Sequence, residues 1–231
     1  MVGKYFAVVT EKINLAGDNW LVKFKFEENL EYEAGQYLSL KVSDSGDRRS
    51  YSIASRPNGR LLELMVDVAP MGVGSKYVLG LKVGDKIEAL CPLGAFSIQP
   101  SEISEQKKIL FVATGSGIVP MKPIIEDLLI DQKYKERLVL VWGMRHKEEL
   151  YWIEEFKKLE KDFSNFEFKL VLSQAGDDWG GHRGHVADVF DKNYEEWSAY
   201  ICGNKEMIAQ TAAILEGTGI KRKNIHYEKF Y

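Results

Sequence analysis

The chain has 231 residues, of which 45% are apolar and 28% are charged, and its formal net charge is −3. These values are ordinary for a folded protein with its own core, and they give no sign of nucleic-acid binding. Cys91 and Cys202 are too few for an iron–sulfur cluster, and no apolar run approaches the roughly 20 residues that span a bilayer. We expect one or two domains, two free thiols and a cytoplasmic protein.

The first hundred residues predict short strands separated by turns. In the segment 61–68, Leu62 and Leu64 share one face while Glu63 and Asp67 point away, which is the two-residue period of a half-buried strand. The clearest strands are predicted at 5–13, 20–26, 37–42, 61–68 and 86–91, with a short helix at 75–81. Short strands with regular turns favour a small antiparallel barrel or sandwich, and we predict an N-terminal antiparallel β-barrel domain over 1–100.

The pattern changes after Lys107. The apolar run 109–113 is typical of a strand that is buried on both faces. Strands are predicted at 109–113, 138–142, 167–172, 199–202 and 224–230, and helices at 120–133, 148–161, 186–190 and from 205 onwards. This alternation predicts βαβ units and therefore a parallel-sheet α/β domain over 106–231, after a polar boundary segment.

The segment Thr114–Pro120 (TGSGIVP) follows a buried strand and opens a helix. Its glycines let the backbone approach a ligand, and the helix N-terminus offers free N–H groups to a pyrophosphate. The pattern departs from the usual dinucleotide fingerprint, because Pro120 replaces the third glycine and the next strand does not end in an acidic residue. The alternative is a tight strand-to-helix turn without a ligand.

The segment Arg49-Ser50-Tyr51-Ser52 lies on a predicted strand of the first half. Arginine presents a planar fork to phosphate, and Tyr51 returns to the same face, where its ring can lie on an aromatic cofactor. Ser52 faces the other way with a hydroxyl donor. Taken alone, the segment favours a plain strand with a surface arginine and a half-buried tyrosine.

Three further segments each have a structural alternative. Gly72–Ser75 is a glycine turn in which Ser75 either caps a short helix or helps to hold a phosphate. Cys202-Gly203-Asn204 ends a predicted parallel strand, where ligands bind in α/β sheets, although a buried cysteine is commonly a filler. The terminal residues 227–231 end in two aromatic side chains that either pack on the barrel or stack on a cofactor.

Together and in this order, these segments resemble the ferredoxin–NADP reductase superfamily of flavoprotein reductases over nearly the whole chain. The resemblance rests on six matches. They are Arg49, Tyr51 and Ser52 in the flavin motif, the loop 72–75, the segment 91–96 with Cys91 in place of the first glycine, the loop 114–120, the nucleotide-side segments 143–145 and 202–204 with Met207, and the terminal 228–230.

The resemblance implies roles on the flavin side. Arg49 would hold the FAD pyrophosphate with Gly74 and Ser75, and Tyr51 would pack on the isoalloxazine. Ser52 would lie near flavin N5. The main chain of Val66 and Val68 would meet the ring edge, and Phe230 or Tyr231 would cover the flavin face and move before nicotinamide could stack there.

The resemblance also implies roles on the nicotinamide side, where Thr114 and Cys202 would flank the ring and Glu228 would lie near the reaction centre. Ser52, Cys202 and Glu228 are the implied catalytic residues. The implied nucleotide-binding set is Thr114, Gly115, Ser116, Gly117, Arg145, Ser173, Gln174, Gly203 and Met207.

The pair Ser173-Gln174 favours NADH over NADPH, because NADPH-specific relatives often carry an arginine after this serine. Glutamine lacks the charge that best meets a 2′-phosphate. Arg145, Arg183 and the basic run 221–223 are the alternative sources of positive charge. His182 and His185 lack a third ligand in the sequence, so we expect no metal site.

The resemblance therefore predicts an NAD(P)H-dependent FAD reductase that passes electrons to a separate acceptor, such as ferredoxin, flavodoxin or an oxygenase component. A reductase that releases free reduced flavin is an alternative, against which the loop 72–75 argues. A subunit that binds nucleotide without turnover is another, against which Ser52, Cys202 and Glu228 argue.

Overall fold

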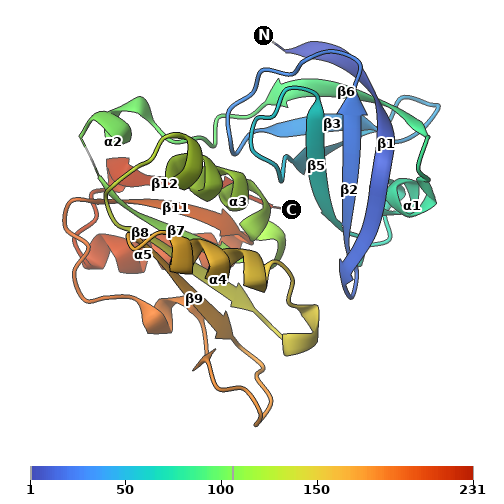
Figure 1. Ribbon diagram of the computed structural model, residues 1–231. Coiled ribbons are helices and arrows are strands. Elements are labelled where there is room, and N and C mark those ends of the chain that lie inside the picture. Colours follow the sequence, from blue (N-terminus) through green and yellow to red (C-terminus); the bar gives the residue numbers. More distant parts are fainter. Residues whose placement is uncertain (1, 106, 231) are drawn as a thin grey trace. The chain divides into compact units, whose positions relative to one another are not determined.

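The structure is a computed structural model that describes residues 2–105 and 107–230. The chain separates into two compact units, each with its own sheet (Figure 1). Unit 1 runs up to Ser97 and also takes in Val119–Asp127, and unit 2 comprises Ile98–Ile118 and the residues from Leu128 onwards.

Unit 1 is built on an antiparallel sheet of six strands in the order β4-β3-β6-β1-β2-β5. The strands are β1 (Gly3–Ala16), β2 (Asn19–Phe26), β3 (Tyr37–Lys41), β4 (Arg48–Ser52), β5 (Leu61–Asp67) and β6 (Lys86–Leu93). An antiparallel bridge between Ile53 and Leu64 joins the chain after β4 to β5, so the two edges of the sheet meet. The predicted antiparallel barrel is confirmed.

Alternation along the strands builds the core of unit 1. Leu62 and Leu64 are buried, whereas Asp67 is exposed and Glu63 is partly so. Burial of each such leucine stabilises the fold by about 1.5–3 kcal/mol. The one helix described between β5 and β6 is α1 (Val73–Gly80), which begins two residues before the predicted start at residue 75.

Unit 2 is built on a parallel sheet of six strands in the order β10-β9-β8-β7-β11-β12. The strands are β7 (Lys108–Thr114), β8 (Leu138–Met144), β9 (Phe166–Leu172), β10 (His182–Arg183), β11 (Trp197–Gly203) and β12 (Ile225–Lys229). The predicted parallel α/β architecture is confirmed. The chain order reverses on the two sides of β7, so β7 and β11 flank a topological switch point, where α/β sheets bind ligands beyond the carboxyl ends of the strands.

The helices that follow β7 differ from the prediction at their ends. The helix predicted at 120–133 is α3 (Ile118–Glu126), which belongs to unit 1 from Val119 onwards and continues as a π-helical turn over Asp127–Asp131. The helix predicted at 148–161 corresponds to α4 (Ile153–Asp162), which begins five residues later than predicted. The left-handed backbone of Trp152 (φ 56°) separates it from a 3₁₀ turn at Lys147–Glu149. The helix from 205 is α5 (Lys205–Gly217), with Asn204 as its cap.

The boundary segment forms a short helix, α2 (Pro100–Ser104), that is tied to unit 2 by Glu102. The buried Glu102 carboxylate accepts a hydrogen bond from Tyr200 and lies 2.9 Å from Nε2 of His226. Burial disfavours its charge, but hydrogen bonds, first among them those from His226 and Tyr200, and the attraction of His226 together outweigh burial, so the pKa of Glu102 lies below its usual value. The boundary segment is therefore fixed to β11 and β12.

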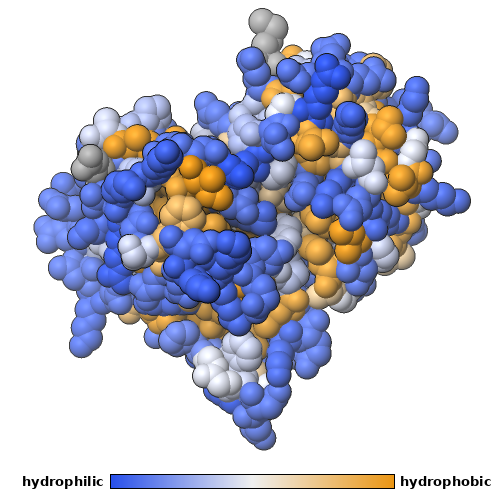
Figure 2. All heavy atoms as spheres, viewed as in Figure 1, coloured by the Kyte–Doolittle hydropathy of each residue, from blue (hydrophilic) through white to orange (hydrophobic). Residues whose placement is uncertain are grey.

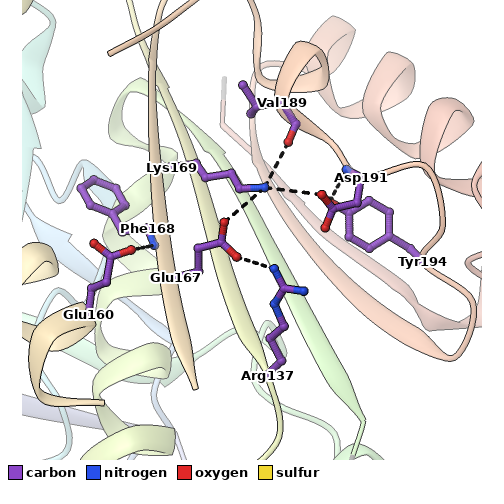
Figure 3. A network of polar contacts seen from close by, with 8 residues as sticks. All are labelled: Arg137, Glu160, Glu167, Phe168, Lys169, Val189, Asp191 and Tyr194. Carbon is purple, nitrogen blue, oxygen red and sulfur yellow. Dashed lines mark hydrogen bonds and ion pairs between the residues drawn. The ribbon is translucent and has the colours of Figure 1, made fainter. Parts of the chain in front are cut away.

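A polar network crosses β9 (Figure 3). The Lys169 ammonium lies 3.4 Å from Glu167, 3.7 Å from Asp191 and 3.3 Å from the Val189 carbonyl oxygen. Arg137 pairs with the other oxygen of Glu167. These contacts hold the 3₁₀ turn Val186–Val189 to the sheet.

On the face shown in Figure 2, hydrophilic residues cover most of the surface and apolar residues occur in small groups. Over the part of the chain that the structure describes, every helix is too short or too polar to cross a membrane.

Candidate cofactor-binding sites

In unit 1, Arg49, Tyr51 and Gly74 come together. Arg49 and Tyr51 lie two residues apart on β4, so their side chains share one face of the strand, as the sequence predicted. The start of α1 lies against that face. A Cβ atom on Gly74 would lie 2.2 Å from Tyr51 Oη and 3.0 Å from Arg49 Cγ. A side chain at this position would have to displace Tyr51 or Arg49, so glycine is what lets the start of α1 approach the two residues.

The first amides of α1 lie in this cluster. The first backbone hydrogen bond of the helix runs from Lys76 to the Gly72 carbonyl oxygen, at 3.0 Å. The amides of Val73, Gly74 and Ser75 therefore precede the intrahelical bonds and remain as donors. Of the two roles considered for Ser75, the structure excludes that of helix cap, because the helix starts at Val73 and Ser75 lies inside its first turn.

The donors in this cluster suit a pyrophosphate. The exposed Arg49 guanidinium donates to the Arg48 carbonyl oxygen at 2.7 Å and keeps further N–H groups. Guanidinium and helix-start amides are the groups that bind phosphate oxygens best. The partly buried Tyr51 ring packs on the core beside them, and burial raises the pKa of its hydroxyl group. The chemistry of the donor set and the close approach that Gly74 permits fit the flavin dinucleotide that the resemblance implies.

The other predicted flavin-side residues lie elsewhere in unit 1. Ser52 ends β4 and is buried, opposite Tyr37 in the ladder. Val66 lies on β5 and pairs with Trp20 of β2. The N–H of Val68 already donates to the Asp18 carbonyl oxygen at 2.9 Å, so this amide is committed within the protein. Contact of this main chain with a flavin ring edge stays a prediction.

In unit 2, glycines bring Thr114, Gly117, Cys202 and Gly203 together at the carboxyl ends of β7 and β11. A Cβ atom on Gly117 would lie 2.2 Å from the Cys202 carbonyl oxygen, and one on Gly203 would lie 2.5 Å from Thr114 Oγ1. The backbone of the loop 115–117 can therefore lie directly on the end of β11. This is the switch point of the sheet, and the predicted Thr114 and Cys202 meet there.

Glu228 joins this cluster from β12. It is the direct neighbour of Cys202 in the parallel ladder, and its Oε2 atom is buried without a hydrogen-bond partner among the described residues. Burial raises the pKa of Glu228 to about 7. Burial and the nearby Glu228 also raise the pKa of the Cys202 thiol well above its usual value. Cys202 is therefore a neutral thiol, and Glu228 holds a proton below neutral pH.

The flanking residues of this site are positioned by hydrogen bonds. The Asn204 side chain accepts a hydrogen bond from Met207 N at 2.8 Å, which caps α5 beside the loop. A Cβ atom on Gly203 would also lie 2.3 Å from Met207 Cε. Phe230 N donates to the Gly203 carbonyl oxygen at 3.1 Å, so the terminal segment continues along β11. Tyr231 lies outside the described residues.

A second group of predicted residues follows the carboxyl ends of β8 and β9, at the edge of the sheet that also carries Thr114 and Cys202. These residues are Arg145, Ser173 and Gln174. The amides of Ser173 and Gln174 donate to the carbonyl oxygens of Met144 and Arg145, each at 3.0 Å, so the chain remains paired beyond β8 and β9. All three predicted side chains are exposed.

The other candidate cations are placed differently. Arg183 donates to the carbonyl oxygens of Ala175, Gly176, Asp177 and Trp179 at 2.9–3.3 Å and so holds the loop that follows β9. The residues 221–223 precede β12 and lie at the amino ends of the parallel strands, opposite the edge that carries Gln174.

Sequence reasoning missed Trp142, which it used only as the end of a strand. The indole Nε1 donates to the Gly115 carbonyl oxygen at 3.0 Å. A large aromatic residue one strand away from a glycine loop was the available signal, but hydropathy alone assigns such a residue to the core.

Two protein-family models match the chain. The oxidoreductase FAD-binding domain matches residues 7–98, and the oxidoreductase NAD-binding domain matches residues 111–213. The flavin-side cluster lies within the first match, and the loop 114–117 with Cys202 and Gly203 lies within the second. Glu228 and Phe230 lie beyond it.

Several known proteins are similar over most of the chain. The reductase component of phenol 2-monooxygenase from Pseudomonas sp. (strain CF600) is 31% identical over 100% of this chain and 66% of its own length. Ferredoxin–NADP reductase B from Sorangium cellulosum (strain So ce56) is 29% identical over 86% of this chain and 85% of its own. The crystal structure of an Amycolatopsis cytochrome P450 reductase superposes with a TM-score of 0.92, at 30% identity over 99% of this chain and 70% of that one. The chain spans about two thirds of the length of the first and the last of these.

Replacement of Gly74 by alanine should weaken flavin binding. The new methyl group must displace Tyr51 or Arg49, and such overpacking corresponds to about tenfold in affinity. The measurement is the FAD content of purified protein after desalting. Gly72→Ala is the matched control, because no atom lies within 4 Å of a Cβ atom there and its φ is −71°. Equal flavin retention in the two variants would contradict the assignment.

Glu228→Gln should raise the melting temperature in a pH-dependent way. The pKa of Glu228 is higher in the folded chain than in the unfolded one, so ionisation disfavours folding as the pH rises. The advantage of the variant should grow from about pH 4.5, the ordinary pKa, to about pH 7, and then level off. Melting curves of both proteins across this range test the sign, and an advantage that shrinks with rising pH would refute it.

Proposed function

The chain belongs to the ferredoxin–NADP reductase superfamily, and we propose that it is an NAD(P)H-dependent flavoprotein reductase that passes electrons to a separate acceptor. The observation that supports this most directly is the presence of one cofactor cluster in each matched domain, built around Gly74 in unit 1 and around Gly117 in unit 2. In this proposal residues 1–100 form the FAD-binding domain and residues 106–231 form the NAD(P)-binding domain.

On the flavin side, Arg49 and the first amides of α1 would bind the FAD pyrophosphate. Tyr51 would offer its ring to the isoalloxazine, and the Ser52 hydroxyl group would be the donor near the reacting edge. When bound, the nicotinamide would supply a hydride that the flavin accepts and releases as single electrons. The protein's contribution is to bind and orient both groups and to exclude water.

On the nicotinamide side, the loop 115–117 would bind the dinucleotide pyrophosphate through backbone N–H groups. Thr114 and Cys202 would flank the nicotinamide ring. Because the Cys202 thiol stays neutral, it offers a compact surface of low polarity rather than a nucleophile. Glu228 would hold a proton at its buried oxygen and could donate it as a hydrogen bond below about pH 7.

NADH is the dinucleotide that we propose for this site. Gln174 carries no charge for a 2′-phosphate, and Arg183 is committed to four loop carbonyl oxygens. The residues 221–223 lie at the other edge of the sheet. Of the cations considered in the sequence, Arg145 then remains, and the nearby Lys147 is paired with Asp178 at 2.6 Å. The adjacent Asp177 carries a charge that repels a phosphate.

The acceptor we favour is an oxygenase component. A relative that aligns along the whole chain is the reductase component of phenol 2-monooxygenase. A ferredoxin or flavodoxin is the other candidate acceptor, in line with the similarity to ferredoxin–NADP reductase B. A cytoplasmic location belongs to the same proposal, because Cys91 and Cys202 are both free thiols, as a reducing compartment maintains them.

Anaerobic titration of desalted, purified protein tests the proposal. The protein should be yellow after desalting, and NADH should bleach the flavin absorbance at lower concentration than NADPH. Colourless protein that reduces added flavin would instead support a free-flavin reductase. A bound flavin that neither dinucleotide bleaches would support a subunit without turnover. A preference for NADPH would refute the argument from Gln174.

A further inference from the structure

We propose that Trp142 is the positioning residue of the nucleotide-binding loop, an inference that rests on the proposed function. Trp142 lies near the carboxyl end of β8, the strand next to β7, and is completely buried. Its indole Nε1 donates to the Gly115 carbonyl oxygen at 3.0 Å. The contact therefore links the core of unit 2 to the first peptide group of the loop 115–117.

This hydrogen bond fixes the direction of one peptide group. The Gly115–Ser116 bond is trans, and in a planar trans peptide the N–H points opposite to the C=O. With the Gly115 carbonyl oxygen turned towards the buried indole, the Ser116 N–H is turned away from it. That orientation offers the amide as a donor to an anion at the start of α3.

The loop needs such a constraint because Gly115 does not supply it. Its φ is +53°, and no atom lies within 4 Å of a Cβ atom built there, so side-chain packing does not select one conformation. The Gly115 carbonyl oxygen also accepts from Ile118 N, the residue that begins α3. A carbonyl oxygen has two lone pairs, and the indole occupies the second.

The donor itself is held rigidly. The Trp142 ring makes edge contacts with Tyr151 at 5.1 Å and with Phe156 at 6.1 Å between ring centroids. Phe156 lies on α4 and in turn packs on Phe168 of β9, at 5.2 Å. The indole can therefore turn away from Gly115 only if the packing of α4 on the sheet changes.

The test compares Trp142→Phe with Trp197→Phe. The first variant keeps a ring and removes the N–H donor. The second makes the same change at another buried tryptophan of unit 2, at the amino end of β11, opposite the loop. The readouts are the Kd for NAD⁺, the FAD content after desalting, the melting temperature, and hydrogen exchange of the segment 114–118 without nucleotide.

Trp142→Phe should weaken NAD⁺ binding about five- to tenfold, the effect of one lost hydrogen bond, and should speed exchange of the loop amides. Its FAD content should match that of Trp197→Phe, which should bind NAD⁺ like the wild type.

Equal NAD⁺ affinities in the two variants would overturn the inference and leave the proposed function intact. Parallel loss of FAD and NAD⁺ would also overturn it, because that pattern marks general destabilisation. Wild-type protein that binds neither FAD nor NAD⁺ would overturn the proposed function and the inference together.

The wild-type protein supplies a second test that needs no variant. In protein labelled with ¹⁵N at the indole groups, the Trp142 N–H should exchange slowly with D₂O, and its signal should shift when NAD⁺ is added. The Trp197 signal should stay constant. A Trp142 signal that exchanges rapidly or ignores saturating NAD⁺ would overturn the inference.

Discussion

The close approach of glycine backbone to its neighbours is the constraint on which both candidate sites depend. In unit 1, α1 approaches the side chains of Arg49 and Tyr51 so closely at Gly74 that a Cβ atom there would contact both of them. In unit 2, a Cβ atom on Gly117 would contact the Cys202 carbonyl oxygen in the same way. Each glycine brings the N-terminal amides of a helix up to a strand end, and this combination of free N–H donors is what an anionic dinucleotide requires.

The fold was largely predictable because burial repeats with the period of each element. Alternation at 61–68 predicted a half-buried antiparallel strand, and the apolar run 109–113 predicted a strand buried on both faces. Element ends were less predictable, because they depend on single backbone conformations. The left-handed Trp152 delays α4 until Ile153, and no hydropathy pattern reports such a turn. The boundary helix α2 likewise forms around the tertiary contacts of Glu102 with Tyr200 and His226.

The candidate sites were predictable in part. Strand periodicity placed Arg49 and Tyr51 on one face, and the family resemblance implied that Thr114 and Cys202 lie together. What the sequence could not supply were contacts between distant segments. Two examples are the hydrogen bond from Trp142 to the Gly115 carbonyl oxygen and the hydrogen bonds that Arg183 donates to loop carbonyl oxygens. The raised pKa of Glu228 follows from its burial beside β11, which only the folded sheet defines.

The central claim is that the residues around Gly74 bind FAD and the residues around Gly117 bind the nicotinamide dinucleotide. Arg49→Ala tests it most directly, with FAD content after desalting and the Kd for NAD⁺ measured on the same protein. Loss of the guanidinium removes charge-assisted hydrogen bonds to the pyrophosphate, so FAD affinity should fall about tenfold or more, while NAD⁺ affinity should stay within about twofold. Full retention of FAD, or an equal fall in both affinities, would contradict the account.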